Sequence, residues 1–351
     1  MWADIEKEIN AYLDYDPNLF RDKTILLPCD DPEWSNFTKF FALRFEEYGI
    51  KKLISTSYAP DSKPDDVGYQ SSLFEQDSPQ FDPAKDRARG KKFVLEPKDI
   101  NGDGVINYDD LEWEYLDGDG DFRSDEVTAL RDEADFVITN PPFSLFREFV
   151  AWLVAGGVRF AVVGNLNAIT YKEVFPLIKG NRVWLGATNF NTGMYFRVPD
   201  TFVYASTYKF DREQGGAKVS RVPGVCWFTD IEHGRRHAPL QLMSEADNIK
   251  FSKHKQVKGV GYQKYDNYDA IEVPFTDAIP SDHDGVMGVP ITFLDKYCPD
   301  QFEIVGSQRW ARGPVIADIY CGDKTADTDF KTLINGRETY DRIFIRRKDD
   351  Q

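Results

Sequence analysis

Short β-branched, apolar runs alternate with amphipathic segments through the first half of the chain. The pattern predicts strands at 24–29, 51–57, 92–95, 135–139, 159–164 and 182–185, with helices at 35–48, 124–132, from 143 onward and at 171–178. Strands that alternate with helices are joined by right-handed crossovers, which produce a sheet covered on both faces. We therefore predict an α/β fold with a doubly wound, mostly parallel sheet that binds its ligands at the carboxyl ends of the strands.

The pattern changes after about residue 187. The stretches "MYFRVPDTFVYASTYKF" and "VPGVCWFTDI" are typical of antiparallel strands, and the segments after them are rich in turns and aromatic residues. We expect a first part at 1–190, with an acidic insertion at about 96–126. The second part, 191–351, is expected to hold the end of the same sheet and a mixed α+β region.

Composition favours a globular intracellular protein. Of the 351 residues 41% are hydrophobic, and the longest apolar runs are far too short to cross a bilayer. The N-terminal "MWADIEKEIN" is acidic and lacks the order of a signal peptide, so we expect a cytoplasmic location. The four cysteines, Cys29, Cys226, Cys298 and Cys321, form no CxxC pair, which indicates neither a zinc site nor a disulfide framework.

Charge is distributed unevenly along the chain. The net charge is −16, and Met1–Val150 holds 17 Lys and Arg against 34 Asp and Glu, which leaves 26 against 25 for the remainder. Contact with a polyanion is therefore expected from the second half, through clusters such as "HGRRH" (233–237) and "KHKQVK" (253–258). The alternative, given equal weight, is that these clusters form only a solvated charged face and bind nothing.

The stretch "DFVITNPPF" ends a buried strand in a rigid, donor-poor corner. Asn140 supplies a side-chain amide, Pro141 and Pro142 supply peptide units without N–H groups, and Phe143 closes the corner with a ring. Such a corner can accept two hydrogen bonds from an exocyclic amine, while Phe143 stacks on the base that carries it. That arrangement suits methylation of an amino nitrogen. In the alternative reading the prolines only end the strand and Phe143 fills core.

The Asn-Pro-Pro-Phe corner resembles the signature of S-adenosylmethionine-dependent amino-methyltransferases. The likeness extends along most of the chain, through "GDGDFRSDE" (118–126), "GNLNAITYKEVF" (164–175), "WLG" (184–186), "YDNYDAIEV" (265–273) and "GVMGVPITFLDKYCPDQFEIVG" (285–306). In this order the motifs resemble the EcoRI-type adenine-specific DNA methyltransferases. The resemblance implies methyl transfer to N6 of adenine in DNA, with Asn140, Pro141, Pro142 and Phe143 as the catalytic motif.

The same resemblance suggests where the cofactor lies. Asp121 and Phe122 resemble the acidic-aromatic pair that contacts the adenine of S-adenosylmethionine. A glycine-rich cofactor loop is absent after the first strand. The residues expected there instead, at the strand end and the following helix N-terminus, are Pro28, Asp30, Asp31, Ser35 and Asn36. The second strand ends in "STSY", so a ribose contact would come from Thr56 or a neighbouring hydroxyl.

The acidic segment "DINGDGVINYDD" matches the spacing of a calcium-binding loop. The ligands would be Asp99, Asn101, Asp103, the Val105 carbonyl and Asp110. No helix is predicted before Asp99, and the last position holds Asp where Glu is usual. Structural calcium and a solvated acidic turn remain two open alternatives.

The target adenine would lie inside a duplex, so the enzyme would extrude it into the corner. The expected partners are double-stranded DNA and a cognate restriction endonuclease that acts on the same site without direct contact. This places the chain in a prokaryotic or phage-infected cell. Three alternatives remain: an amino-methyltransferase for another amine (cytosine N4, an RNA base or a protein glutamine), a catalytically inactive DNA-binding relative, and a calcium-dependent binding module.

Overall fold

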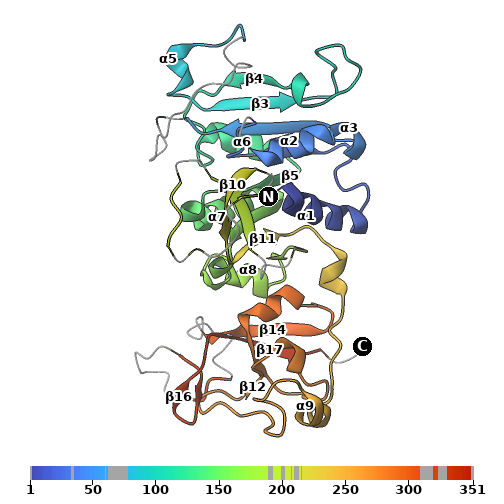
Figure 1. Ribbon diagram of the computed structural model, residues 1–351, viewed down its shortest axis with the longest axis vertical. Coiled ribbons are helices and arrows are strands. Elements are labelled where there is room, and N and C mark those ends of the chain that lie inside the picture. The colour runs from blue at the N-terminus through green and yellow to red at the C-terminus, as the bar shows by residue number, and fades with distance from the viewer. Residues whose placement is uncertain are drawn as a thin grey trace. The chain divides into compact units, whose positions relative to one another are not determined.

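The computed structural model describes residues 2–32, 35–59, 61, 78–188, 193–198, 202–206, 208, 213–214, 216–308, 319–322 and 330–348. By its contacts the chain divides into two compact units. Unit 1 is Met1–Ala168 with Leu185–Glu232, and unit 2 is Ile169–Trp184 with His233–Gln351. Figure 1 labels the helices and strands of both units. The functional division near residue 190 stays a prediction.

Unit 1 is built around a sheet in the order β4-β3-β2-β1-β5-β6-β11-β7. Its four central strands, β2 (Lys52–Ser57), β1 (Thr24–Leu27), β5 (Phe136–Thr139) and β6 (Arg159–Asn165), are parallel neighbours. The outer strands are β3 (Lys91–Leu95), β4 (Glu112–Tyr115), β11 (Val225–Thr229) and β7 (Trp184–Leu185). Of these, β3, β4 and β11 run antiparallel to their inner neighbours. The α/β prediction with a mostly parallel core is confirmed.

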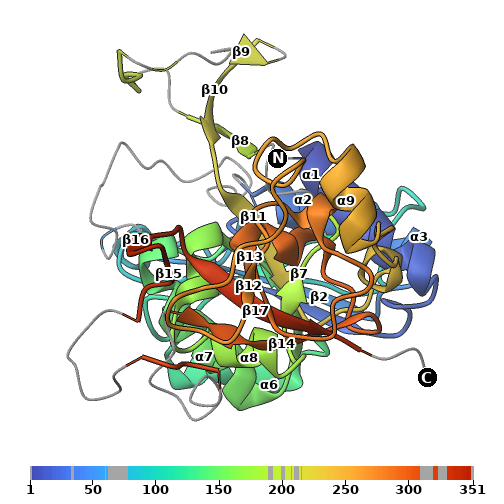
Figure 2. The ribbon, with the colours of Figure 1, turned by 90° about the horizontal axis from the view of Figure 1, so that it is seen from below.

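Helices cover both faces of this sheet because its crossovers run in two directions. The helices are α1 (Trp2–Tyr15), α2 (Asn36–Leu43), α3 (Phe45–Tyr48), α5 (Pro83–Asp86), α6 (Asp125–Glu133) and α7 (Phe146–Gly156). The step from β1 to β2 goes one way from the centre, and the step from β5 to β6 goes the other. With right-handed crossovers, the connecting helices then fall on opposite faces. Figure 2 shows α1 and α2 on one side of the strands and α6 and α7 on the other.

Local sequence sets where these helices begin. The Ser35 side chain accepts a hydrogen bond from the Phe37 N–H and so caps α2. Ser124 caps α6 by accepting from the Val127 N–H. Phe37, Phe40, Phe41 and Phe45 recur at helical spacing and all lie in the core of unit 1, within the segment where a helix was predicted.

Helix α1 was not predicted, and it is held by a buried carboxylate. Glu8 is fully buried and accepts hydrogen bonds of 2.7 Å from the Tyr12 hydroxyl and from the N–H groups of Ala187 and Thr188. A Cβ on Gly186 would lie 2.0 Å from the Glu8 carboxylate, so this glycine permits the close approach. The glycine of the "WLG" motif therefore lets Glu8 on α1 bind the backbone that follows β7.

A second, smaller sheet of unit 1 is formed by β8 (Met194–Arg197), β10 (Ala217–Val222) and β9 (Glu213–Gln214) in that order. Both pairings are antiparallel. β8 lies in the first stretch predicted to form antiparallel strands, whereas β9 and most of β10 fall between the two predicted stretches. Figure 2 shows this sheet extending away from the α/β layers. We call it the β8–β10 ribbon.

Unit 2 is a mixed α+β body. It contains α8 (Phe175–Lys179), α9 (Glu245–Phe251), β12 (Ile271–Glu272), β13 (Met287–Pro290), β14 (Phe302–Ser307), β15 (Leu333–Ile334), β16 (Arg337–Glu338) and β17 (Arg342–Arg347). Its four-stranded sheet has the order β12-β13-β17-β14. The expected helix at 171–178 starts later, at Phe175, where Pro176 fits the first turn.

The long motifs at 265–273 and 285–306 form the scaffold of unit 2. Arg342 donates to both carboxylate oxygens of Glu272, which also accepts from the Tyr265 hydroxyl, and all three side chains are buried. Gly288 leaves room for the Tyr265 ring, because a Cβ would lie 2.2 Å from its hydroxyl.

Among the residues that the structure describes, none of the helices has the length and apolar character that a membrane span requires.

Candidate active site

A cavity of about 730 Å³ opens in unit 1 at the carboxyl ends of β1, β2 and β5. This is the point where the strand order reverses direction, the usual ligand position in an open α/β sheet. The volume is within the range of pockets that hold cofactors and substrates. The residues that line it are Cys29, Asp31, Ser57, Tyr58, Gly120, Asp121, Phe122, Arg123, Asn140, Pro141, Pro142, Phe143, Ser144, Leu145, Phe196 and Val222.

The Asn-Pro-Pro-Phe corner forms one wall of this cavity. Asn140 follows the last residue of β5, and its Oδ1 atom is buried without a hydrogen-bond partner in the structure. The Pro142 carbonyl accepts from the Leu145 N–H at 3.0 Å and starts the short helix η3 (Phe143–Leu145). The Phe143 ring is 37% exposed. A buried acceptor without a partner costs free energy, so Asn140 Oδ1 is arranged to receive a donor from a ligand.

The "GDGDF" segment forms another wall because its backbone lies against the end of β2. The Ala59 N–H donates to the Asp119 carbonyl at 2.7 Å, and the Gly90 N–H donates to the Gly118 carbonyl at 2.9 Å. Gly120 adopts φ 84°, and a Cβ there would lie 2.3 Å from the Ser57 carbonyl oxygen. Only glycine fits this position, and it brings Asp121 and Phe122 to the cavity.

Asp121 is held by its neighbour Arg123. Arg123 Nε and Nη2 donate to the two Asp121 oxygens at 2.9 and 2.6 Å, and Nη1 donates to Glu148 at 2.7 Å. The Arg123 hydrogen bond lowers the pKa of the Asp121 carboxyl, so this group is ionised at neutral pH. Phe122 lines the cavity but packs edge-on against Phe149 and Trp152.

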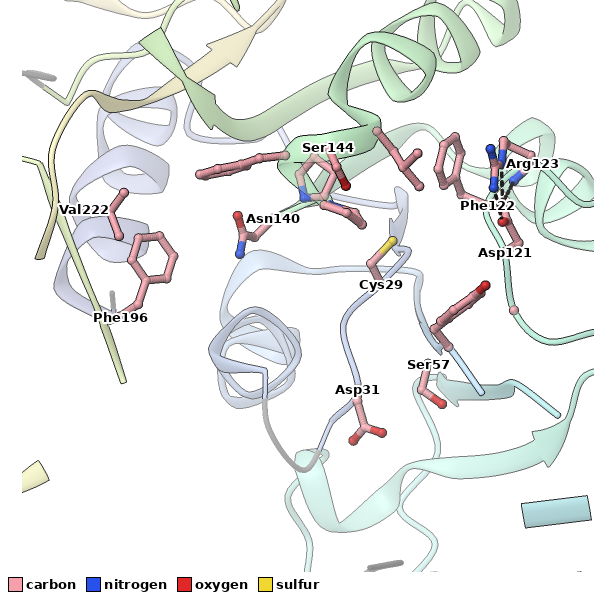
Figure 3. Close-up of a pocket in the computed structure, with 16 residues that line it drawn as sticks. Cys29, Asp31, Ser57, Asp121, Phe122, Arg123, Asn140, Ser144, Phe196 and Val222 are labelled. Carbon is pink, nitrogen blue, oxygen red and sulfur yellow. Dashed lines mark hydrogen bonds and ion pairs between the residues drawn. The ribbon is translucent and has the colours of Figure 1, made fainter. Parts of the chain in front are cut away.

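The turn after β1 does without the usual glycine. Cys29 adopts φ 77°, the left-handed conformation that glycine takes readily, and its side chain lines the cavity. Burial raises the pKa of the Cys29 thiol, so it stays neutral. Asp31 lines the cavity as well. Figure 3 shows Cys29 between Asn140 on one side and a group formed by Asp31, Ser57 and Asp121 on the other.

Beneath the cavity, Asp30 joins the turn after β1 to the end of β5. Its carboxylate accepts from the Ser35 hydroxyl at 2.6 Å, and its other oxygen lies 2.5 Å from Thr139 Oγ1. Thr139 Oγ1 also lies 2.5 Å from the Pro28 carbonyl oxygen. A hydroxyl has one proton, so both Thr139 contacts are hydrogen bonds only when Asp30 is protonated and donates. Burial raises the pKa of Asp30 to about 7, in agreement with this arrangement.

Comparison with known proteins identifies the family. The model of the family described as "Adenine-specific methyltransferase EcoRI" matches residues 1–348. The chain is 37% identical over 349 residues to the Type II methyltransferase M.EcoRI of Escherichia coli, covering 99% of this chain and 91% of that protein. The chain belongs to the EcoRI family of adenine-specific methyltransferases. No solved structure matches it.

Two further relatives come from mycoplasmas. The Type II methyltransferase M.MpnI of Mycoplasma pneumoniae is 33% identical over 306 residues, which cover 87% of this chain and 80% of the relative. M.MgeORF184P of Mycoplasma genitalium is 31% identical over 354 residues, which cover 98% and 93%. The resemblance inferred from the motifs is thereby confirmed. Membership of this methyltransferase family implies S-adenosylmethionine as the methyl donor.

The cavity of this EcoRI-family enzyme brings together seven of the residues selected from sequence: Asn140, Pro141, Pro142, Phe143, Asp31, Asp121 and Phe122. The other five, Pro28, Asp30, Ser35, Asn36 and Thr56, are not among its lining residues. Ser35 and Asp30 bond to each other, and Thr56 is fully buried. The assignment of these five residues to the cofactor stays a prediction.

Some lining residues were expected only in general terms, and others were missed. Ser57 and Tyr58 follow Thr56 at the end of β2, and they are neighbouring hydroxyls of the kind expected for a ribose contact. Phe196 and Val222 lie on the β8–β10 ribbon, far along the chain. Nothing in the local sequence marked them, because only the tertiary fold brings them to the corner.

The acidic segment "DINGDGVINYDD" lies in the loop that connects β3 to β4 at the edge of the sheet. Its contacts give the calcium prediction no support. Asp99 accepts from the N–H groups of Gly102 and Gly104, and Asp110 accepts from those of Ile100, Asn101 and Asn107. Asn101 and Asp103 likewise accept from backbone N–H groups within the loop, the latter from Val105. Within the described part of the chain, no three His, Cys, Asp or Glu side chains are grouped to hold a metal ion.

The protonation of Asp30 predicts a pH effect on stability. Its native pKa of about 7 exceeds the ordinary value near 4, so this group lowers the free energy of unfolding as pH rises from about 4 to 7. Asn in place of Asp30 can donate to Thr139 and accept from Ser35, so Asp30→Asn should keep the fold and remove this dependence. Urea unfolding gives the free energy of unfolding of the variant relative to that of the wild type. This difference should be higher at pH 8 than at pH 5 by up to about 3 kcal/mol. A difference between the two proteins that is constant with pH would contradict the assignment.

Proposed function

We propose that this chain transfers the methyl group of S-adenosylmethionine to N6 of an adenine that is extruded from double-stranded DNA. The observation that supports this most directly is that Asn140 lines the cavity and its buried Oδ1 has no hydrogen-bond partner in the structure. An acceptor in this position suits the exocyclic amine of a base. We assign the catalytic role to Asn140, Pro141, Pro142 and Phe143.

The corner acts by holding the amine, and it needs no strong base. Asn140 Oδ1 and a backbone carbonyl of the corner would accept the two N6 hydrogens, which turns the nitrogen lone pair toward the methyl donor. The prolines keep the corner rigid because their φ angles are fixed. Phe143, exposed on the cavity wall, would stack on the purine ring. The extruded base loses its stacking in the duplex, at a cost of a few kcal/mol, and this ring offsets part of the loss.

The other end of the cavity fits S-adenosylmethionine, which supplies an electrophilic methyl group on a sulfonium. Asp121 is ionised and positioned to accept from an amino group, and Ser57 and Tyr58 bring hydroxyls to the end of β2, where a ribose contact was expected. Asp31 offers a carboxylate at the same end. These residues would orient the donor so that its methyl group faces Asn140.

Contacts to the DNA backbone are assigned to unit 2. The "HGRRH" cluster is occupied within the unit, since Arg235 pairs with Asp295 at 2.5 Å and the buried Arg236 lies over the Trp184 ring. In the "KHKQVK" cluster Lys253 pairs with Asp277 at 2.7 Å, and Lys255 and Lys258 are exposed after α9. We assign phosphate contacts that fix register without reading sequence to these two exposed lysines.

The proposal is tested by expressing the chain in a methylation-deficient bacterium and sequencing the DNA with detection of modified bases. We expect N6-methyladenine at one short sequence, and none in cells that express Asn140→Ala. Transfer of tritiated methyl groups to a duplex with that sequence, followed by nucleoside analysis, identifies the amine. Label in N4-methylcytosine, in RNA or in protein would contradict the proposal and support the alternative amines.

A methyltransferase of this kind protects DNA in the cytoplasm of a prokaryotic or phage-infected cell. We therefore also expect a restriction endonuclease that recognises the same sequence and does not contact this chain. Once the sequence is known, lysates of the source cells should cut unmethylated plasmid at that sequence and leave methylated plasmid intact.

A further inference from the structure

One face of the β8–β10 ribbon is turned toward the core and the cavity. Phe196 pairs with Ser220 across the two strands, and Met194 pairs with Val222, so these four side chains share a face. Met194 is 2% exposed in the core of unit 1, and Phe196 and Val222 pack against that core. The buried Met194 fixes which face looks inward, and alternation along the strand brings Phe196 to the cavity.

Phe196 lies across the cavity from the catalytic corner. Figure 3 shows the Asn140 side chain directed toward the space that separates it from Phe196 and Val222. Among the described residues, no ring contact involves Phe143 or Phe196, whereas Phe122, Phe146 and Phe149 all have aromatic partners. Phe143 and Phe196, whose rings have no aromatic partner among the described residues, therefore line the same cavity as Asn140, whose Oδ1 has no hydrogen-bond partner.

We propose that Phe196 is a second wall of the base site, where it packs on the extruded adenine and positions it against Asn140. This inference rests on the proposed function. It assigns the Asn140 end of the cavity to the base, because the polar groups suited to the cofactor, Asp31, Ser57 and Asp121, lie toward the other end. The ribbon then contributes a ring to substrate capture and not only to the fold.

The proposal predicts a defect in base capture with intact cofactor binding. Stacking on an aromatic ring strengthens nucleic-acid binding by about 5- to 150-fold per base, so Phe196→Ala should slow single-turnover methylation about 10- to 100-fold at subsaturating DNA. Phe196→Tyr, which keeps the ring, should restore most of the rate. Calorimetry with S-adenosylhomocysteine should give affinities within about twofold of the wild type for both variants.

Base capture is measured with a duplex that carries the methylation sequence found by sequencing and has 2-aminopurine in place of the target adenine. The wild type should change the fluorescence of this duplex on binding, and Phe196→Ala should require more enzyme to reach the same change. Tyr15→Ala is the matched control, since this aromatic residue is 51% exposed on α1 and does not line the cavity. It should behave as the wild type in all three measurements.

Wild-type rates and fluorescence for Phe196→Ala would overturn the proposal, and so would a loss of S-adenosylhomocysteine affinity as large as the loss of rate. If Phe196→Ala does not fold, Phe196→Leu decides, because it keeps an apolar side chain without the aromatic face. We expect this variant to lose several-fold in rate, and full activity would refute the role. If Asn140→Ala and Phe143→Ala also keep full transfer, the proposed function itself has failed.

Discussion

Replacing Asn140 by alanine is expected to lower methyl transfer by about 10³-fold or more, while S-adenosylhomocysteine still binds. The side-chain oxygen is buried in the cavity without a partner, so its removal takes away a hydrogen bond that only the substrate amine would form. The end of the cavity to which we assign the cofactor is built from other elements, the end of β2 and the "GDGDF" segment, and is not touched by this change. The loss should therefore appear in the rate and not in cofactor affinity.

The measurement is single-turnover transfer of a tritiated methyl group to the duplex identified by sequencing, with calorimetry for cofactor affinity. Asn140→Asp keeps an oxygen acceptor in the same place and should retain measurable turnover, unlike Asn140→Leu. Asn18→Ala is the matched control, because Asn18 is exposed and its side chain accepts a hydrogen bond from the nearby Arg21. Wild-type turnover by Asn140→Ala would show that the corner does not hold the reacting amine.

The sequence predicted the central sheet and the rigid Asn-Pro-Pro-Phe corner after β5 because both are encoded locally. The strand before Asn140 is apolar and β-branched, the prolines are adjacent to it, and a helical pattern follows. The carboxyl ends of parallel strands then meet at one edge whatever the loops between them do. Asn140 and Asp31 come together in the cavity for that reason, although they are more than a hundred residues apart.

Features that depend on tertiary contacts could not be predicted in this way. Helix α1 depends on the buried Glu8, which receives its hydrogen bonds from Ala187 and Thr188 about 180 residues later. The sequence shows Glu8 only as one more acid in an acidic segment. Phe196 reaches the cavity through a cross-strand pairing, and its neighbours in sequence give no sign of that.

The turn after β1 places two adjacent carboxylates in different surroundings. Asp30 and Asp31 are both predicted from the sequence to contact the cofactor. In the structure Asp31 lines the cavity, whereas Asp30 is buried against Ser35 and Thr139. Neighbouring residues in an irregular turn point in different directions, and that direction is set by partners that the local sequence does not reveal.

Gly120→Ala should disable the cofactor end of the cavity. At φ 84° an alanine is strained, and its Cβ would lie 2.3 Å from the Ser57 carbonyl oxygen and 3.3 Å from Gly90 Cα. Backbone atoms cannot turn aside as a flexible side chain can, so the 118–122 segment must move away from β2. We expect a loss of about 2–4 kcal/mol in the free energy of unfolding and at least a 10-fold loss in S-adenosylhomocysteine affinity.

Gly118→Ala provides the control for this change, two residues away in the same segment. Its added Cβ would have only the Glu126 carboxylate within reach, at 3.9 Å, and Gly118 is not in the left-handed region. Both variants add the same methyl group, so a difference between them in urea unfolding and calorimetry isolates the close approach at Gly120. If Gly120→Ala bound S-adenosylhomocysteine as tightly as Gly118→Ala does, Asp121 and Phe122 would not be cofactor contacts. The methyl donor would then have to be held by the turn after β1, at Cys29 and Asp31.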